Sequence, residues 1–240
     1  MAKHLIILQR TLYKRPGRII IETAKRFNIK VNIVKLWRQS IPSLAKYDGL
    51  VVLDGSLPCL DDKSYSSFQK QKEIIHNALN EDRPYLGIGL GHHLLALNQG
   101  ADIGTNYCCS IGFTTAYLTH KGREHPIFKD IPCSLSVFKW HNRAIMPPIP
   151  SNIDVLATSV DCQFEAVSVP SRPYITGLQF INNVASPREV KRYLAKDQEW
   201  LSSAASHGIN QAFIMAEAKR LHSETSRYFT ILFSNFINML

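Results

Sequence analysis

The chain has 240 residues, of which 45% are hydrophobic and 20% charged, a balance that excludes a disordered chain and indicates a substantial buried core. It contains 28 Lys and Arg against 19 Asp and Glu, so its formal net charge is +9. The basic residues are scattered and not interleaved with aromatic ones, so a solvated basic surface explains this charge, and nucleic-acid binding is the weakest of the functions that it allows.

The cysteines form an odd set of five with no Cys-x-x-Cys pair, which argues against a disulfide framework or a zinc site. The apolar run within MAKHLIILQR is too short for a signal peptide, and the apolar segment YFTILFSNFINML is too short to span a bilayer. We therefore expect a soluble, cytoplasmic protein in a reducing compartment, with no membrane association, metal or cofactor.

The first hundred residues alternate between short apolar runs and helical patterns. The runs that predict strands are residues 4–8, 31–37, 49–55 and 84–89, and the helical stretches are residues 16–27, 61–80 and 90–98. Such alternation is typical of a parallel sheet with helices on both faces. Ligands of such sheets lie beyond the carboxyl ends of the strands, where residues 54–59, 87–93 and 180–183 fall.

From about residue 111 the pattern changes to strands that follow strands, and from Pro187 onward it is helical. The short β-rich segments are FTTAYLT, LSVFKWH, DVLATS, FEAVSV and YITGLQF. No repeat or linker interrupts the chain. The sequence predicts an α/β fold with an open, mainly parallel central sheet flanked by helices, an added β-rich segment and C-terminal helices, in a single domain over residues 1–240.

One segment, PYLGIGLGHHLLAL at residues 84–97, combines an apolar strand, a glycine-rich turn and the start of a helix. A turn of this kind is where α/β enzymes place a nucleophile, at a sharp and strained point of the backbone. Here the middle of the turn is Gly89, which has no side chain. The segment therefore predicts the geometry of a catalytic turn without its reactive group.

This turn resembles the nucleophile elbow of class I glutamine amidotransferases, in which the corresponding phrase reads P-x-L-G-I-C-L-G-H-Q. YDGLVVLDGS is similar to the family's strand and oxyanion loop, with Asp54 in place of the first glycine. DDKSY, SIGF, VFKWHNRAIMPPIP and GLQF are similar to further phrases of the family, in the same order. The resemblance covers nearly the whole chain and implies the family's fold.

In this family a cysteine thiolate attacks the glutamine amide, a histidine transfers protons and a glutamate orients the histidine. The resemblance puts these three positions at Gly89, Ile181 and Asn183. Glycine cannot form a thioester and isoleucine cannot move a proton, whereas glycine relieves about 1–3 kcal/mol of strain at such a turn. The resemblance thus implies a catalytically degenerate protein, a pseudoenzyme, that binds, regulates or acts as a scaffold.

The rest of the pocket frame is retained, and the resemblance makes Gly55, Ser56, Leu90, His93 and His141 candidates for binding a ligand. The two histidines have alternatives, because His93 could be structural or exposed and His141 could serve packing. Backbone N–H groups at a helix start bind anions, so a small carboxylate or amide is the expected ligand. Family members deliver ammonia to a synthetase, so the implied partner is a synthetase, another protein or a second copy.

The alternative function is an enzyme of altered chemistry, a hydrolase or an amidotransferase-type enzyme, with a displaced nucleophile in the same cleft. Cys59, just after the expected oxyanion loop, is the candidate nucleophile, although free cysteines are more often inert. We expect His120 and His125 at the surface and assign no role to Glu165.

Overall fold

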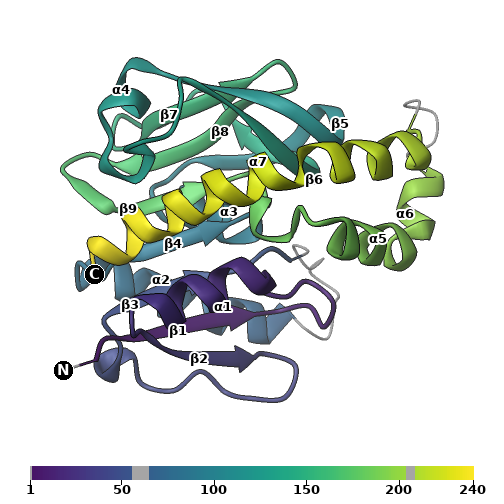
Figure 1. Ribbon diagram of the computed structural model, residues 1–240. Helices are drawn as coiled ribbons and strands as arrows, with labels where there is room; N and C mark the ends of the chain where they lie inside the picture. Colours follow the sequence, from purple (N-terminus) through teal and green to yellow (C-terminus); the bar gives the residue numbers. More distant parts are fainter. Residues whose placement is uncertain (1, 56–64, 204–208) are drawn as a thin grey trace.

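The computed structural model describes residues 2–55, 65–203 and 209–240. All nine strands of this part lie in one sheet, in the order β2-β1-β3-β4-β9-β8-β7-β5-β6 (Figure 1). The strands are β1 His4–Gln9, β2 Lys30–Lys35, β3 Gly49–Val52, β4 Tyr85–Ile88, β5 Asp102–Leu118, β6 Ser134–Met146, β7 Asp154–Ser159, β8 Cys162–Val169 and β9 Arg172–Leu178.

Seven α-helices and three short 3₁₀ turns complete the described part of the chain. The helices are α1 Gly17–Arg26, α2 Tyr65–Asn80, α3 Leu90–Asn98, α4 His120–Glu124, α5 Pro187–Lys196, α6 Gln198–Ser203 and α7 Gln211–Asn238. The 3₁₀ turns are Leu44–Lys46, Pro126–Phe128 and Asn182–Val184. The expected start of α2 at Asp61 lies outside the described residues.

The sheet has two halves that differ in strand direction. The pairings from β2 through β1, β3 and β4 to β9 are parallel. From β9 onward, β8, β7, β5 and β6 pair antiparallel. The predicted fold class is confirmed, because a parallel α/β sheet carries the predicted β-rich segment as an antiparallel extension and ends in helices.

The central strands β1, β3 and β4 are buried on both faces because they are almost entirely apolar and successive side chains point to opposite faces, whereas β2 at the edge is largely exposed. In β1, Leu5 and Ile7 pack into one core while Ile6 and Leu8 pack into the other. The first core is covered by α1, α5 and α7, and the second by α2 and α3. Continuous apolar strands thus produce a three-layer arrangement.

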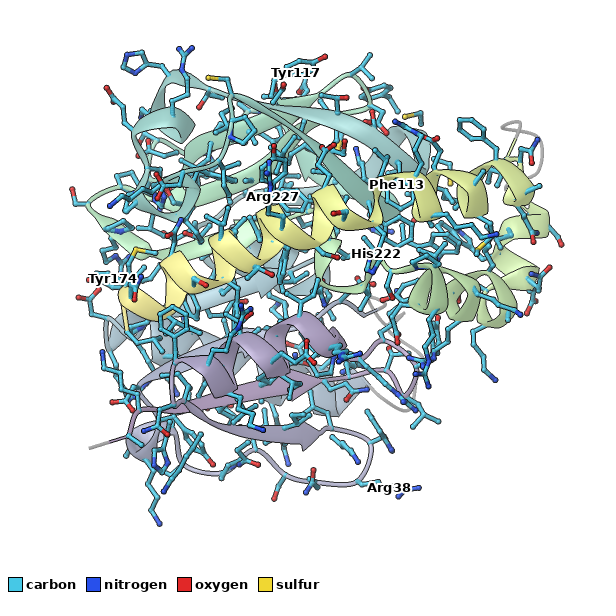
Figure 2. The ribbon with its side chains drawn as sticks, viewed as in Figure 1. Arg38, Phe113, Tyr117, Tyr174, His222 and Arg227 are labelled. Atoms are coloured by element: carbon cyan, nitrogen blue, oxygen red, sulfur yellow. The ribbon has the colours of Figure 1, made fainter. Side chains whose placement is uncertain are left out.

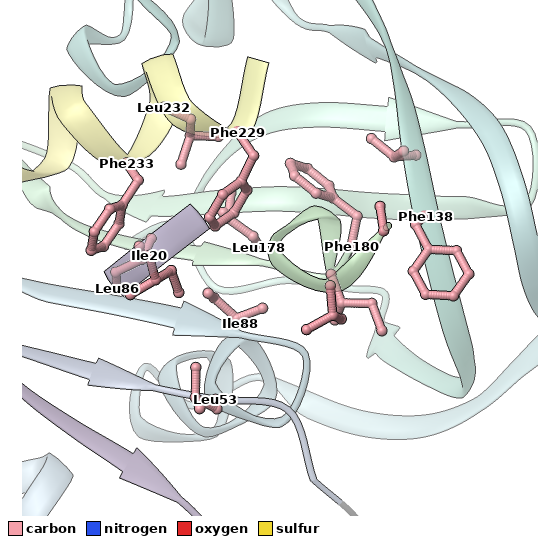
Figure 3. Packing of buried hydrophobic residues seen from close by; sticks show 14 of the residues in the cluster. Ile20, Leu53, Leu86, Ile88, Phe138, Leu178, Phe180, Phe229, Leu232 and Phe233 are labelled. Carbon is pink, nitrogen blue, oxygen red and sulfur yellow. The ribbon is translucent and has the colours of Figure 1, made fainter. Parts of the chain in front are cut away.

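The first core is dominated by the apolar side of the long helix α7. Figure 3 shows Phe229, Leu232 and Phe233 of α7 above Leu178 of β9, and all four are buried. Helix α7 also packs against α1, from which Ile20 joins the same core. Burying one aromatic side chain in this way stabilises the fold by about 1.5–3 kcal/mol, so α7 is an integral layer of the structure.

The outer surface carries most of the charged and polar side chains. Figure 2 shows Arg38, which follows β2, and Tyr117 of β5 at opposite ends of the molecule. His120 is exposed as expected, whereas His125 is half-buried because its ring packs at the start of the 3₁₀ turn and Nδ1 accepts from the Ile127 N–H at 3.3 Å. None of the described helices is both long and apolar enough to cross a membrane.

Candidate functional site

A cavity of about 380 Å³ opens at the carboxyl ends of the parallel strands. Asp54 and Gly55 follow β3, Gly89 and Leu90 follow β4, and Gln179 follows β9. The loop after β1 contributes Tyr13 and Lys14, while β6 contributes Trp140, His141, Asn142 and Arg143. Asp197 and Trp200 complete the lining from the C-terminal helices. The cavity therefore lies where ligands bind in open α/β sheets.

The glycine-rich turn has the sharp geometry that the sequence predicts. Gly89, between β4 and α3, has φ +56° and ψ −105°, and its N–H donates to the Leu178 carbonyl at 2.8 Å. Two residues later, a Cβ on Gly91 would lie 2.3 Å from the Val52 carbonyl oxygen. Glycine at position 91 is thus required by the close approach of α3 to β3, and glycine at position 89 suits the positive φ.

The side chain of Asp54 fills the space that a side chain on residue 89 would need. A Cβ built on Gly89 would lie 2.4 Å from Asp54 Oδ1. The other carboxylate oxygen, Oδ2, lies 2.7 Å from Lys14 Nζ, and the two side chains are only 12% and 7% exposed. An ion pair therefore occupies the centre of the turn, where an elbow would present a nucleophile.

The other two positions that the resemblance assigns to the triad serve packing. Ile181 is 2% exposed, and its N–H donates to the Phe138 carbonyl at 2.9 Å. Asn183 is buried, and its Nδ2 donates to the Pro16 carbonyl at 3.1 Å, beside the start of α1. Neither side chain is part of the cavity lining. Ile181 joins the first core, and Asn183 ties the turn after β9 to α1.

Two histidines line the cavity, and a third lies behind it. His93 Nε2 lies 2.7 Å from Gln179 Oε1, and burial lowers the pKa of His93 to about 4. His141 is half-buried, its Nδ1 lies 3.0 Å from the Arg143 carbonyl oxygen, and burial together with Lys139 holds its pKa well below the usual range. His92 is fully buried, and burial lowers its pKa to about 3. All three imidazoles are therefore neutral at pH 7.

One wall of the cavity is aromatic and is organised around Asp197. The Asp197 carboxylate accepts from the Tyr13 hydroxyl and, at 2.7 Å, from Trp140 Nε1. The Trp140 ring packs against Tyr193 and Trp200, with centroids 5.5 Å and 5.8 Å away. The carboxylate thus holds the loop after β1 against β6 and fixes the shape of the cavity.

A second cluster of charged side chains lies within the antiparallel half. Lys139 Nζ of β6 lies 2.5 Å from Glu165 Oε1 and 2.7 Å from Asp161 Oδ1, and the Ser159 hydroxyl lies within hydrogen-bonding distance of the same two carboxylates. Lys139 is 1% exposed and Glu165 is fully buried. Burial alone would lower the pKa of Lys139, but the neighbouring carboxylates raise it above its usual value. Glu165, for which the sequence predicts no role, thus anchors this cluster.

Two predicted site residues, Ser56 and the candidate nucleophile Cys59, lie outside the described residues. The four cysteines within the described ranges are Cys108, Cys109, Cys133 and Cys162, and none of them lines the cavity. Burial raises the pKa of the Cys162 thiol to about 12, so it is not a thiolate at neutral pH. Over the same ranges no group of three His, Cys, Asp or Glu side chains could hold a metal ion.

Five residues that the sequence singles out, Gly55, Gly89, Leu90, His93 and His141, come together in the one cavity. The residues that give the cavity its charge and its aromatic wall were not predicted. These are Tyr13, Lys14, Gln179, Asp197 and Trp200. Gln179 could have been found from its place just after β9, but Lys14 and Asp197 reach the cavity from loops whose path no local pattern predicts.

Comparison with known proteins gives consistent results. The family model described as "Glutamine amidotransferase class-I" matches residues 13–196. A glutamine-hydrolyzing GMP synthase subunit of Methanocaldococcus jannaschii is 34% identical over 117 residues, which cover 49% of this chain and 60% of that protein. The chain thus spans about three-fifths of the length of this curated relative.

Solved structures share the fold at low sequence identity. A glutamine amidotransferase from Thermotoga maritima superposes with a TM-score of 0.84 at 19% identity, covering 99% of both chains. A glutamine amidotransferase from Methylobacillus flagellatus superposes with a TM-score of 0.83 at 19% identity, covering 100% of this chain and 96% of that one. The fold is common to all three. Since the family model covers more than half of its length, the chain belongs to the class I glutamine amidotransferase family.

Proposed function

We propose that this chain is a catalytically degenerate glutamine amidotransferase-like protein, with a binding, regulatory or scaffolding role in place of glutamine hydrolysis. The observation that carries the proposal is the position of the Asp54 carboxylate, 2.4 Å from where a Cβ on Gly89 would lie. A cysteine at this turn would collide with Asp54, so the two residues are matched to each other. Residue 89 has no sulfur atom with which to form a thioester.

The surroundings of Ile181 and Asn183 support the same proposal. Glutamine hydrolysis needs a proton carrier next to the nucleophile and a group that orients it. Ile181 has no titratable group and packs into the core, and Asn183 is bonded to the backbone at Pro16. The histidines that do line the cavity, His93 and His141, lie beside Gln179 and the Arg143 carbonyl, with no thiol among the described lining residues.

The cavity favours a small ligand with a carboxylate or an amide. Lys14 and Arg143 supply positive charge, and Gln179 and the neutral His93 supply hydrogen-bonding groups. A volume of about 380 Å³ is at the small end of the range for ligand pockets. The Asp54 carboxylate repels an anion placed directly above Gly89, so the ligand's anionic group lies toward Arg143.

A protein partner is the second part of the proposal. Several relatives are named as one subunit of a glutamine-hydrolyzing GMP synthase, which describes a component of a larger assembly. We propose that this chain likewise acts with a synthetase, another protein or a second copy, in the cytoplasm, and modulates that partner without supplying ammonia.

The test is a direct assay of glutamine hydrolysis on the purified chain. We expect no ammonia release above the buffer control and no covalent labelling by a glutamine-mimicking chloroketone. The Cys59→Ala variant serves as the control for labelling at the displaced candidate. Ammonia release that Cys59→Ala abolishes would establish the alternative, an enzyme of altered chemistry, and would overturn the proposal.

Ligand binding is measured separately from catalysis. Calorimetric titration with glutamate and glutamine, on the chain and on Arg143→Ala, tests whether the cavity still binds a carboxylate or an amide. We expect saturable binding that weakens by about tenfold in Arg143→Ala, the loss of one charge-assisted contact. Binding that the substitution leaves unchanged would place the ligand elsewhere.

A further inference from the structure

A second hollow, which we call the basic groove, lies on the outside of the parallel half. Its volume is about 670 Å³, and it is lined by the ends of β1 and β2, the start of α1 and the start of α5. Five of the lining residues are basic, namely Arg15, Arg18, Lys35, Arg188 and Arg192, and only Glu22 and Glu189 are acidic. The groove therefore carries a net positive charge.

Three of these basic side chains are available to a partner. Arg18 pairs with Glu22, and Arg192 pairs with Glu189. Arg15, Lys35 and Arg188 are exposed and make no ion pair within the described ranges of the chain. Unpaired cations that share one hollow raise the local potential and attract acidic groups.

The basic groove also contains solvent-exposed apolar side chains. Leu12 is 64% exposed and Ile21 is 38% exposed, and Trp37 lies half-buried between β2 and the solvent. Arginine with exposed aliphatic and aromatic groups is the composition of protein interfaces. Nucleic acid would use aromatic rings for stacking but would leave Leu12 and Ile21 exposed.

The start of α1 adds to the positive charge of the groove. Its first turn contains no acidic residue, and Pro16 at the N-cap makes no side-chain hydrogen bond to the helix. The free N–H groups of a helix start carry partial positive charge, which acidic side chains neutralise. The start of α1 therefore adds to the positive potential that Arg15, Lys35 and Arg188 already produce in the groove.

From this charge and apolar pattern we infer that the basic groove binds an acidic segment of a partner protein that also carries leucine-like side chains. The acidic residues pair with Arg15, Lys35 and Arg188, while the apolar ones cover Leu12 and Ile21. This deepens the proposed function, since it rests on there being a protein partner and names where that partner binds and by what chemistry.

The groove and the cavity are built from the same two segments. In the loop after β1, Leu12 and Arg15 line the groove, whereas Tyr13 and Lys14 line the cavity. Helix α5 gives Arg188 to the groove and leads into Asp197, which binds Tyr13 and Trp140 in the cavity wall. A partner that moves the loop or α5 therefore changes the cavity.

The test uses a fluorescein-labelled peptide of about ten residues rich in Glu, Asp and Leu, which extends over roughly 30 Å. We expect saturable binding by fluorescence anisotropy that weakens as salt is raised. The double variant R15E/R188E reverses two unpaired charges and weakens binding more than about tenfold. The matched control is K219E, at an exposed lysine of α7 outside the groove that makes no ion pair with the described residues, and it leaves binding unchanged.

A second measurement tests the connection to the cavity. The chain has three tryptophans, and W37F leaves only Trp140 and Trp200, both in the cavity wall. We expect the peptide to change the tryptophan emission of W37F, and R15E/R188E on the same background to abolish that change. An unchanged emission at saturating peptide would overturn the connection.

Four outcomes overturn the docking inference. The first is that a peptide with Lys in place of Glu and Asp binds as tightly as the acidic peptide, and the second is that R15E/R188E and K219E bind the acidic peptide equally well. The third is that a single-stranded oligonucleotide binds more tightly than the acidic peptide, and the fourth is that inorganic phosphate alone displaces the peptide. Self-association that R15E/R188E abolishes would assign the groove to a second copy instead. None of these results depends on the ammonia assay, so the groove and the catalytic proposal fail independently.

Discussion

The protein contains two lysine–carboxylate pairs in very different surroundings. Lys14 and Asp54 meet at 2.7 Å beside Gly89, in the lining of a cavity at the carboxyl ends of the parallel strands. Lys139 and Glu165 meet at 2.5 Å between antiparallel strands, where both are almost completely buried. The first pair can reach solvent and ligand through the cavity, whereas the second is closed in by Asp161 and Ser159.

This difference in burial means that the Lys14–Asp54 pair can respond to a ligand, whereas the Lys139–Glu165 pair serves the structure. A buried pair costs desolvation that good geometry and further hydrogen bonds offset, so removal of one partner leaves a buried charge. In the cavity, water can replace a missing partner. The same chemical pair is therefore structural in one half of the sheet and available for binding in the other.

The largest effect is expected from Lys139→Met. This substitution leaves Glu165 and Asp161 facing each other without the ammonium, and loss of one member of a buried pair costs about 3–5 kcal/mol. Urea unfolding followed by circular dichroism measures the change in the free energy of unfolding. The double variant K139M/E165M removes both charges of the pair and is expected to lose less unfolding free energy than K139M alone. An equal or larger loss in the double variant would show that the pair is not buried as the structure has it.

The next largest effect is expected at the turn, from Gly89→Ala. The substitution places a Cβ at positive φ, which costs about 1–3 kcal/mol, and against Asp54, which adds about 1–3 kcal/mol of overpacking. Combination with Asp54→Gly removes only the second cost. A double-mutant cycle on the two sites is thus expected to give a coupling of about 1 kcal/mol or more. Strict additivity would show that Asp54 and Gly89 are not matched.

The elements of the parallel half were predictable because each one follows from a local pattern. The apolar strands, the glycine turn at residues 87–91 and the helix over residues 90–98 all lie where the sequence indicates. Glycine at position 91 is forced by its contact with Val52, so the motif and its structural cause coincide. The cavity position followed from the same elements, since it lies where the parallel strands end.

The chemistry of the site was less predictable because it depends on contacts between distant segments. Tyr13 and Asp197 bond across 184 residues, and Lys14 meets Asp54 from a loop with no regular structure. The sequence predicts no role for Glu165 because its partner, Lys139, lies on another strand. Alternation along a strand predicts that a side chain is buried, but it does not predict which charge lies opposite.

Stability at low pH depends on the buried histidines around the turn. Burial holds the pKa of His92 at about 3, below its usual 6.5, so the unfolded chain binds a proton that the folded chain does not. Stability is therefore fully present above pH 6.5 and is lost as the pH falls below that value, at up to about 1.4 kcal/mol per pH unit. Urea midpoints between pH 7 and pH 5 measure the slope.

The variant His92→Gln cannot titrate and is expected to flatten that slope. The control is His120→Gln, since His120 is exposed and pairs with Glu124 at the surface of α4. Equal slopes in H92Q and H120Q would show that His92 is not the group that takes up the proton. His93 and His125, each with a pKa of about 4, and His141, whose pKa is also well below its usual value, contribute the slope that remains in H92Q.

The smallest effect is expected from Lys14→Met, the same substitution as at Lys139 but in the cavity. Asp54 is 12% exposed whereas Glu165 is fully buried, so the loss is expected to be about 1–3 kcal/mol, below that of K139M. Urea unfolding of K14M and K139M under one set of conditions compares the two pairs directly. Equal losses of unfolding free energy would mean that Asp54, like Glu165, is a structural carboxylate. A smaller loss in K14M would mean that Asp54 and Lys14 can separate and each bind a ligand instead.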